Sequence, residues 1–391
     1  MKLTNLLSLN RNHVIKLVVS IMFLGLVIDM GGEFGLRTIL FPVCTLLLMM
    51  THGLVFPKTW LIPFGILAVY PTISLLIGIL DGAQFSIAIS QYQSTVLAFV
   101  IFILISRIPY EVTMNALLYS LFTVAVLAIG LAAGLVIGVD VIIKIVQFMA
   151  EQGGGYFGER SVGIEAFIPN VYFKATLFLV PSFTIALITK RNWIAIACFL
   201  ALITAVSKTG MAVTSLITLI YISRNVNRKE FIIYGTLLAL AIAAVMMSPI
   251  FFLFEEISRN DSGTLNVRAG HFNSIIEVWS NNPINLLFGF GLGSTFYSSG
   301  AGKVVSNIEI DHLNVIRKYG LLWGTVFFFW VMQVAFSAIR NRQDDVRSLG
   351  WGLLVAFLVA GTNPVLISPI FFLFLFIAMN ANYQISSRNS K

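Results

Sequence analysis

The stretch VTMNALLYSLFTVAVLAIGLAAGLVIGV, residues 112–139, contains no charged side chain over its whole length. A helix needs about 20 apolar residues to cross roughly 30 Å of membrane hydrocarbon. Backbone polar groups find no water there, so a spanning segment must be a helix or a strand of a closed barrel. This stretch is continuously apolar and lacks the alternation of a barrel strand. It therefore predicts a transmembrane helix.

The rest of the chain has the same character. Of its residues, 58% are hydrophobic and 11% are charged, whereas soluble domains carry about 25% charged residues. We predict an all-α, polytopic membrane protein in which residues 1–391 form one integral membrane domain. About twelve spans are expected from the apolar runs, near residues 14–28, 36–54, 60–80, 94–106, 112–139, 171–189, 193–205, 210–223, 231–254, 313–338, 349–362 and 368–382.

Lysine and arginine in the connecting segments set the orientation of such a bundle. With the N-terminus in the cytoplasm, the cytoplasmic segments have a net charge of +11 and the opposite segments −3, which together give the overall +8. This split predicts that both termini are cytoplasmic and that residues 255–312 form a large loop on the outer side. The basic balance is then a topology signal, and no nucleic acid is expected as a partner.

Several classes of chemistry are not supported by the sequence. Cys44 and Cys198 both lie inside apolar runs and are interpreted as packing residues. No metal-ligand spacing is present, and the short cytoplasmic connectors contain no Walker-type phosphate loop. We therefore expect no cofactor and no metal. No internal repeat is evident, which weighs against a transporter built from duplicated halves.

A long polar insertion, from Phe254 to Gly324, interrupts the apolar sequence. Residues 267–281 are predicted to form an amphipathic helix that ends before Pro283. A second helix is predicted to begin near Ser306, where Ser306 and Glu309 have capping-box spacing, and to continue into the membrane. The apolar stripe of the first helix consists of Phe272, Ile275, Ile276 and Trp279.

Reactive side chains gather in this insertion. Arg268 lies on the apolar stripe, His271 is one position before Phe272, and His312 follows Asp311 at the mouth of a span. Histidine is suited to take a proton near neutral pH. The alternative for each histidine is a structural role without chemistry.

Cationic groups near the outer face suit an anionic phosphate. Lys174 and Lys208 are placed at membrane depth, where cations are costly, so we interpret both as substrate-binding candidates. Arg317 and Lys318 are instead expected to snorkel towards head groups. In the run GFGLG, residues 289–293, Gly291 and Gly293 could form a phosphate-cradling turn or a flexible connection.

These motifs together resemble the bacterial O-antigen polymerase and O-antigen ligase superfamily. Ser207-Lys208-Thr209-Gly210 is similar to its Ser-Arg-x-Gly element, with lysine in place of arginine. Arg268, Trp279, Pro283 and the glycine run resemble its Arg…Trp…Pro…Gly-x-Gly element, and His312 with YGLLWG resembles its His…Gly-leucine helix. The resemblance implies a fold similar to that of membrane glycosyltransferases that use lipid-linked sugars.

The resemblance also implies a function. It places the chain in the bacterial inner membrane, with an active site that includes residues 255–312 and faces the periplasm. The implied enzyme is a metal-independent glycosyltransferase of polysaccharide and lipopolysaccharide biosynthesis. It transfers glycan from undecaprenyl pyrophosphate to the next lipid-linked repeat unit, with Arg268 on the pyrophosphate and His312 as the base.

The substrate would be bound by Lys208, His271, Lys174, Gly291 and Gly293. The implied partners are a chain-length regulator, a flippase and membrane lipids. The alternatives are an O-antigen ligase, which transfers glycan to the lipid A core, and a lipid-linked oligosaccharide transporter.

Overall fold

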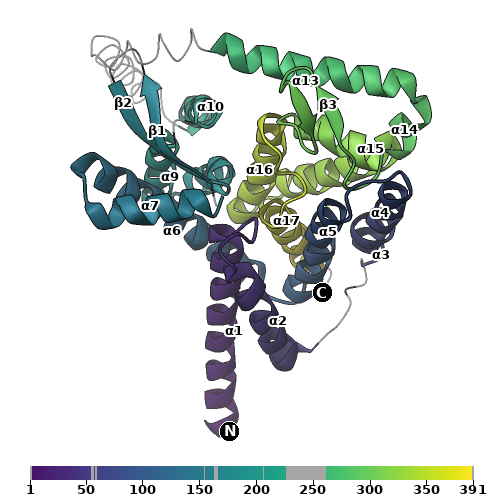
Figure 1. The fold of residues 1–391 in the computed structure, drawn as a ribbon. Coiled ribbons are helices and arrows are strands. Elements are labelled where there is room, and N and C mark those ends of the chain that lie inside the picture. The colour runs from purple at the N-terminus through teal and green to yellow at the C-terminus, as the bar shows by residue number, and fades with distance from the viewer. Residues whose placement is uncertain are drawn as a thin grey trace.

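The computed structural model describes residues 2–53, 57, 60–153, 155–162, 166–205, 207–225 and 261–389. Most of these residues are helical, which confirms the predicted all-α class (Figure 1). The α-helices are α1 (Lys2–Ile28), α2 (Leu36–His52), α3 (Leu61–Phe64), α4 (Tyr70–Leu80), α5 (Phe85–Ile105), α6 (Tyr110–Ile137), α7 (Asp140–Glu151), α8 (Leu179–Ile188), α9 (Asn192–Thr204), α10 (Lys208–Asn225), α13 (Asp261–Asn281), α14 (Pro283–Phe288), α15 (Asp311–Ile339), α16 (Asp344–Val359) and α17 (Pro369–Asn389).

Short elements complete the described chain. A π-helical turn, Gly65–Val69, joins α3 to α4, and 3-10 turns lie at Thr176–Phe178 and Ala360–Thr362. Two antiparallel hairpins, which were not predicted from the sequence, pair β1 (Gly155–Val162) with β2 (Ala166–Phe173) and β3 (Phe296–Ser298) with β4 (Lys303–Val305).

The helices fit a multi-pass membrane protein, but the expected number of spans is not met. Six segments in the described chain are long and apolar enough to cross a membrane: Leu61–Leu80, Phe85–Ile105, Tyr110–Ile137, Asp311–Ile339, Asp344–Thr362 and Pro369–Ser387. Five further predicted spans fall on shorter apolar helices, namely Asn12–Ile28, Leu36–Thr51, Thr176–Ile188, Asn192–Thr204 and Thr209–Tyr221. The predicted span at 231–254 lies outside the described residues, as do residues 255–260 of the predicted loop.

The predicted span at residues 171–189 shows why the count falls short. Strand β2 occupies this segment as far as Phe173, so helix α8 begins only at Leu179. A helix of ten to thirteen residues, such as α8 or α9, covers only about 15–20 Å. That is less than the roughly 30 Å of a bilayer core. An apolar run alone could not distinguish a full span from a strand followed by a short buried helix.

Helix α17 forms the centre of the bundle (Figure 1). Every residue from Ile370 to Ala378 is almost completely buried. Helices α1, α5, α6, α15 and α16 all contact α17. A helix that is apolar on all sides must be surrounded by other elements, and the run IFFLFLFIA meets that condition.

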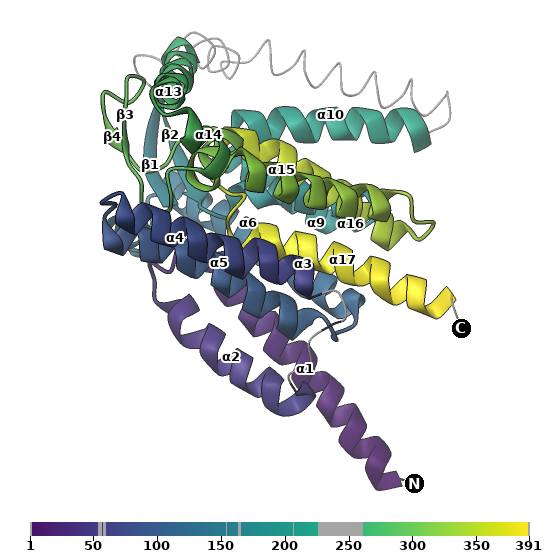
Figure 2. The same cartoon turned by 90° about the vertical axis from the view of Figure 1, so that its right-hand side faces the viewer.

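The polar insertion packs at one end of the bundle, away from the C-terminus (Figure 2). Its own small core consists of Ile275, Trp279, Phe296 and Ile308. Helix α13 ends at Asn281 as predicted, but it begins at Asp261 rather than near residue 267. Of the four residues of the predicted apolar stripe, Ile275 and Trp279 are buried, whereas Phe272 and Ile276 remain exposed.

The predicted capping box at Ser306 and Glu309 is wrong, because helix α15 begins at Asp311. The Glu309 carboxylate instead accepts a hydrogen bond from Arg268 Nε at 3.0 Å, and the Ser306 carbonyl accepts one from Arg317 Nη2 at 2.7 Å. The Glu309 side chain is thus paired with a residue 41 positions away, which short-range spacing cannot reveal.

Candidate functional site

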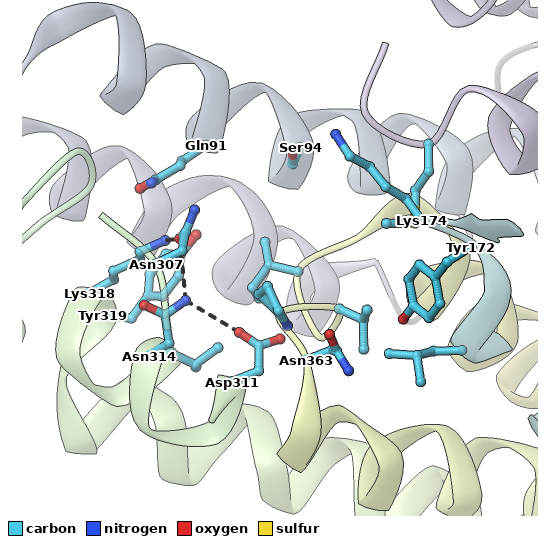
Figure 3. A pocket seen from close by; sticks show the side chains of 16 residues that line it. Gln91, Ser94, Tyr172, Lys174, Asn307, Asp311, Asn314, Lys318, Tyr319 and Asn363 are labelled. Atoms are coloured by element: carbon cyan, nitrogen blue, oxygen red, sulfur yellow. Dashed lines mark hydrogen bonds between the residues drawn. The ribbon is translucent and has the colours of Figure 1, made fainter. Parts of the chain in front are cut away.

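A cavity of about 430 Å³ lies where helix α5, the end of strand β2, the first turns of α15 and the segment after α16 meet (Figure 3). Its wall is unusually polar for an apolar bundle. The polar lining residues are Gln91, Ser94, Tyr172, Lys174, Asn307, Asp311, Asn314, Lys318, Tyr319 and Asn363. Concave sites with a few convergent polar groups are where small molecules bind.

Helix α15 supplies one wall of the cavity. Asp311, Asn314, Val315 and Lys318 all line it, and these positions follow the i, i+3, i+4, i+7 spacing of a single helix face. Three of the four are polar at the start of a membrane helix. The spacing of this polar stripe is present in the sequence, whereas the predicted base is the adjacent residue, His312.

Asp311 is a buried carboxylate held in a fixed orientation. Its Oδ2 accepts a hydrogen bond from the backbone N–H of Leu366 at 2.5 Å, and its Oδ1 accepts one from Asn314 Nδ2 at 3.4 Å. As the first residue of α15, it also lies at the positive end of a helix dipole. A carboxylate has about four acceptor sites, so capacity remains for a substrate group in the cavity.

Two lysine side chains, Lys174 and Lys318, line the same cavity. Lys318 is 7% exposed, and its Nζ donates a hydrogen bond to Asn307 Oδ1. Lys174 forms an ion pair with Glu33. In Figure 3 the two lysines reach the cavity from different elements, with Asp311 in the wall between them. The arrangement can bind an anion beside a carboxylate.

Tyr172 contributes a hydroxyl to the cavity from strand β2. Burial raises the pKa of this phenol, and the negative charge of Glu309 raises it further. The hydroxyl is therefore protonated at neutral pH and can act as a hydrogen-bond donor.

The expectation that Arg317 and Lys318 snorkel to the surface is wrong. Arg317 is 1% exposed, and its guanidinium lies 4.9 Å from the centre of the Phe296 ring. It donates to the Ser294 carbonyl at 3.1 Å, the Ser294 hydroxyl at 2.9 Å and the Ser306 carbonyl at 2.7 Å. Arg317 thus fastens both ends of the β3–β4 segment to helix α15.

The glycine run is fastened to the same helix. Gly320, with a φ of +83°, interrupts α15, and the carbonyls of Arg317 and Lys318 before it accept hydrogen bonds from the Phe290 and Gly291 amides. The next two amides donate to the Ser74 carbonyl at 2.9 Å and to Gln91 Oε1 at 3.0 Å. With four successive amides occupied by protein acceptors, the run is a packing element. It offers no amide cradle for a phosphate.

Of the residues predicted to bind substrate, Lys174 lines the cavity. Lys208 is the first residue of α10. Arg268 and His271 lie on α13, apart from the described lining of the cavity. Arg268 is paired with Glu309, and His271 Nδ1 lies 2.5 Å from Ser298 Oγ. Burial lowers the pKa of His271, and the charge of Glu309 partly opposes this effect, so the imidazole is neutral at pH 7.

His312 lies next to Asp311 in sequence but on another face of α15. The centre of its ring is 4.6 Å from that of Phe357 and 5.5 Å from that of Phe328, both in edge-on contact. Within the described part of the chain, it is not among the residues that line the cavity. The predicted base is therefore packed between aromatic rings, and its neighbour Asp311 is the group that faces the cavity.

Comparison of the chain with models of known protein families and with curated proteins gives no match.

Proposed function

We propose that the protein transfers a glycan from a lipid-linked pyrophosphate donor to an acceptor hydroxyl in this cavity. The reaction we favour is the polymerisation of lipid-linked oligosaccharide repeat units at the periplasmic face of a bacterial inner membrane. One observation carries the proposal: a buried carboxylate, Asp311, and two lysines, Lys174 and Lys318, line one cavity at the end of an apolar helical bundle.

The proposed step is a substitution at the anomeric carbon of the donor sugar. The acceptor oxygen forms a bond to that carbon as the bond to the pyrophosphate oxygen breaks, and lipid pyrophosphate leaves with the electron pair. The acceptor proton passes to Asp311, the one acidic side chain in the described lining. General base catalysis of this kind contributes about 10²–10⁴-fold to the rate.

The lysines act on the leaving group. Negative charge develops on the departing pyrophosphate, and fixed cations stabilise it most strongly where water is excluded. Lys318 is held towards the cavity by Asn307. Lys174 would exchange the Glu33 carboxylate for phosphate when substrate binds. Lysine acts as a point charge and does not require the bidentate geometry of arginine.

In this proposal Arg268 has an indirect role. Its guanidinium is paired with Glu309, two residues before Asp311, so it supports the segment that leads into α15. The assignment of Arg268 to the pyrophosphate, implied by the resemblance, remains a prediction. So does the assignment of His312 as the base.

The Lys318→Met variant should lower turnover by about 10²–10³-fold, the usual effect of removing one group that stabilises developing charge. Methionine retains the buried apolar length and removes only the charge and its hydrogen bond to Asn307. The measurement is turnover by purified protein in nanodiscs with a defined undecaprenyl-pyrophosphate-linked repeat unit, analysed for chain length.

Lys303→Met is the matched control, since Lys303 is an exposed lysine on strand β4, and its turnover should equal that of the wild type. Equal turnover in the Lys318→Met and control variants would remove Lys318 from the mechanism. A wild-type protein that elongates a lipid A core acceptor but not a second lipid-linked unit would identify the ligase alternative. Absence of both products, with transfer of lipid-linked units between leaflets, would identify a transporter.

The orientation is tested by fusions of alkaline phosphatase, which is active only outside the cytoplasm. A fusion after Ser298, in the β3–β4 hairpin, should be highly active, and a fusion after Asn341, beyond the end of α15, should be inactive. The physical basis is the charge split of the connecting segments. The reverse pattern of activity would place the cavity at the cytoplasmic face and exclude the proposed reaction.

A further inference from the structure

Helix α7 (DVIIKIVQFMAE) divides its surface into three parallel stripes. Residues spaced at i, i+4 and i+7 share one face of a helix. In α7, three sets with this spacing share no residue and lie on different faces of the helix. Ile142, Val146 and Met149 form the first stripe. Val141, Ile145 and Phe148 form the second. The third is polar and consists of Asp140, Lys144, Gln147 and Glu151.

The first stripe packs against the protein. Val146 is 5% exposed, and Ile142 and Met149 pack against the main hydrophobic core. The Ile142 side chain lies directly on Gly134 of α6, where a Cβ would come within 2.0 Å of it. Helix α7 is therefore folded back onto the last turn of α6.

The second stripe is apolar but uncovered. Val141 is 65% exposed, Ile145 43% and Phe148 56%. Scattered exposed apolar residues are normal on a protein surface. On α7, however, the three exposed apolar residues lie in one row and form a continuous surface. All the polar residues of the helix lie in a separate row beside it. Such an apolar surface requires an apolar partner.

The position of α7 indicates which partner this is. The apolar span Tyr110–Ile137 ends just before it, and only Gly138 and Val139 separate the two helices. Gly138, with a φ of +76°, ends α6 and turns the chain. A membrane boundary must lie close to the end of that span. Figure 1 shows α7 running across the view beside strand β1.

We propose that α7 lies in the membrane surface, with Val141, Ile145 and Phe148 immersed in lipid and the polar stripe in water. Helices that lie in an interface have this division between an apolar and a polar face. The polar stripe contains one lysine and two acids, so the apolar row, rather than attraction to anionic head groups, carries the contact.

The contact has a structural consequence. Helix α7 packs against strand β1, which is paired with β2 along its whole length. Strand β2 delivers Tyr172 to the cavity, and Lys174 follows immediately. Contact between α7 and the membrane surface would therefore set the depth of Tyr172 and Lys174 relative to the membrane. This placement of α7 depends on the membrane-spanning fold and is independent of the proposed reaction.

The test is site-directed spin labelling in nanodiscs, with no substrate added. Single cysteines replace Ile145, Phe148, Lys144 or Gln147 in a Cys44→Ala, Cys198→Ala background, which removes both native thiols. Accessibility to oxygen, which concentrates in lipid, is compared with accessibility to a water-soluble nickel chelate. Labels at Ile145 and Phe148 should lie about 5–10 Å below the head groups. Labels at Lys144 and Gln147 should be reached by the nickel chelate.

Two results would overturn the proposal. If all four labels are equally accessible to the nickel chelate, α7 lies in water. If the labels at Ile145 and Phe148 are immobile and shielded from both reagents, a protein surface such as a second copy of the chain covers the stripe. Melting curves of the unlabelled variants check folding, and a label at Val141 provides a third position on the same stripe.

Discussion

Replacing Asp311 with asparagine should lower turnover of the lipid-linked donor by about 10²–10⁴-fold, the contribution of a general base. The substitution separates chemistry from structure. The asparagine carbonyl oxygen can still accept the hydrogen bond from the Leu366 amide, which Asp311 Oδ2 accepts at 2.5 Å. Only the capacity to take a proton and the negative charge are lost. Turnover is measured in nanodiscs under single-turnover conditions.

Two comparisons complete the experiment. Asp140→Asn is the matched control, because Asp140 is also a first-turn acid but is exposed on α7, and it should leave turnover unchanged. His312→Ala tests the competing base. If His312 accepts the proton, its loss should produce the 10²–10⁴-fold decrease and Asp311→Asn should be nearly silent. An Asp311→Asn protein with wild-type turnover would exclude Asp311 as the base.

The Gly291→Ala substitution should lower the free energy of unfolding by about 2–5 kcal/mol. A left-handed backbone costs roughly 1–2 kcal/mol for a residue with a Cβ, and Gly291 has a φ of +80°. The added Cβ would also lie 2.1 Å from the backbone nitrogen of Gly78, and overpacking adds about 1–3 kcal/mol. Because the clash is with backbone, no side chain can rotate to relieve it. Unfolding is followed by titration with sodium dodecyl sulfate in mixed micelles.

Gly302→Ala provides the control for backbone strain alone. Gly302 also has a positive φ, +63°, but no atom of the described residues lies within 4 Å of the position of its added Cβ. Its substitution should cost only the roughly 1–2 kcal/mol of a left-handed residue with a Cβ. The two alanine variants could instead unfold at the same mole fraction of sodium dodecyl sulfate. The backbone of the glycine run would then not be in close contact with helix α4, and its proposed packing role would be wrong.

The sequence by itself determined the class of the protein. Continuous apolar runs show where membrane helices can lie. Each apolar side chain contributes a favourable free energy of transfer from water to an apolar environment, and this contribution does not depend on its tertiary contacts. The helix that contains IFFLFLFIA was predictable for this reason. The end of α13 was predictable because Pro283 lacks a backbone N–H and cannot continue a helix. The insertion after Phe254 is also the segment predicted to gather polar groups, and its residues Asn307, Asp311, Asn314 and Lys318 line the cavity.

Only the tertiary structure decided which of those groups share a cavity. The rotation of α15 about its own axis turns Asp311 towards the cavity and His312 towards Phe357. That rotation depends on distant contacts, such as the Leu366 amide on Asp311 and the Ser74 hydroxyl on the Lys318 carbonyl, which are 55 and 244 residues apart in sequence. A one-residue offset moves a side chain about 100° around a helix. Apolar periodicity shows that a face exists, but the neighbour it meets is set by packing between segments that are remote along the chain.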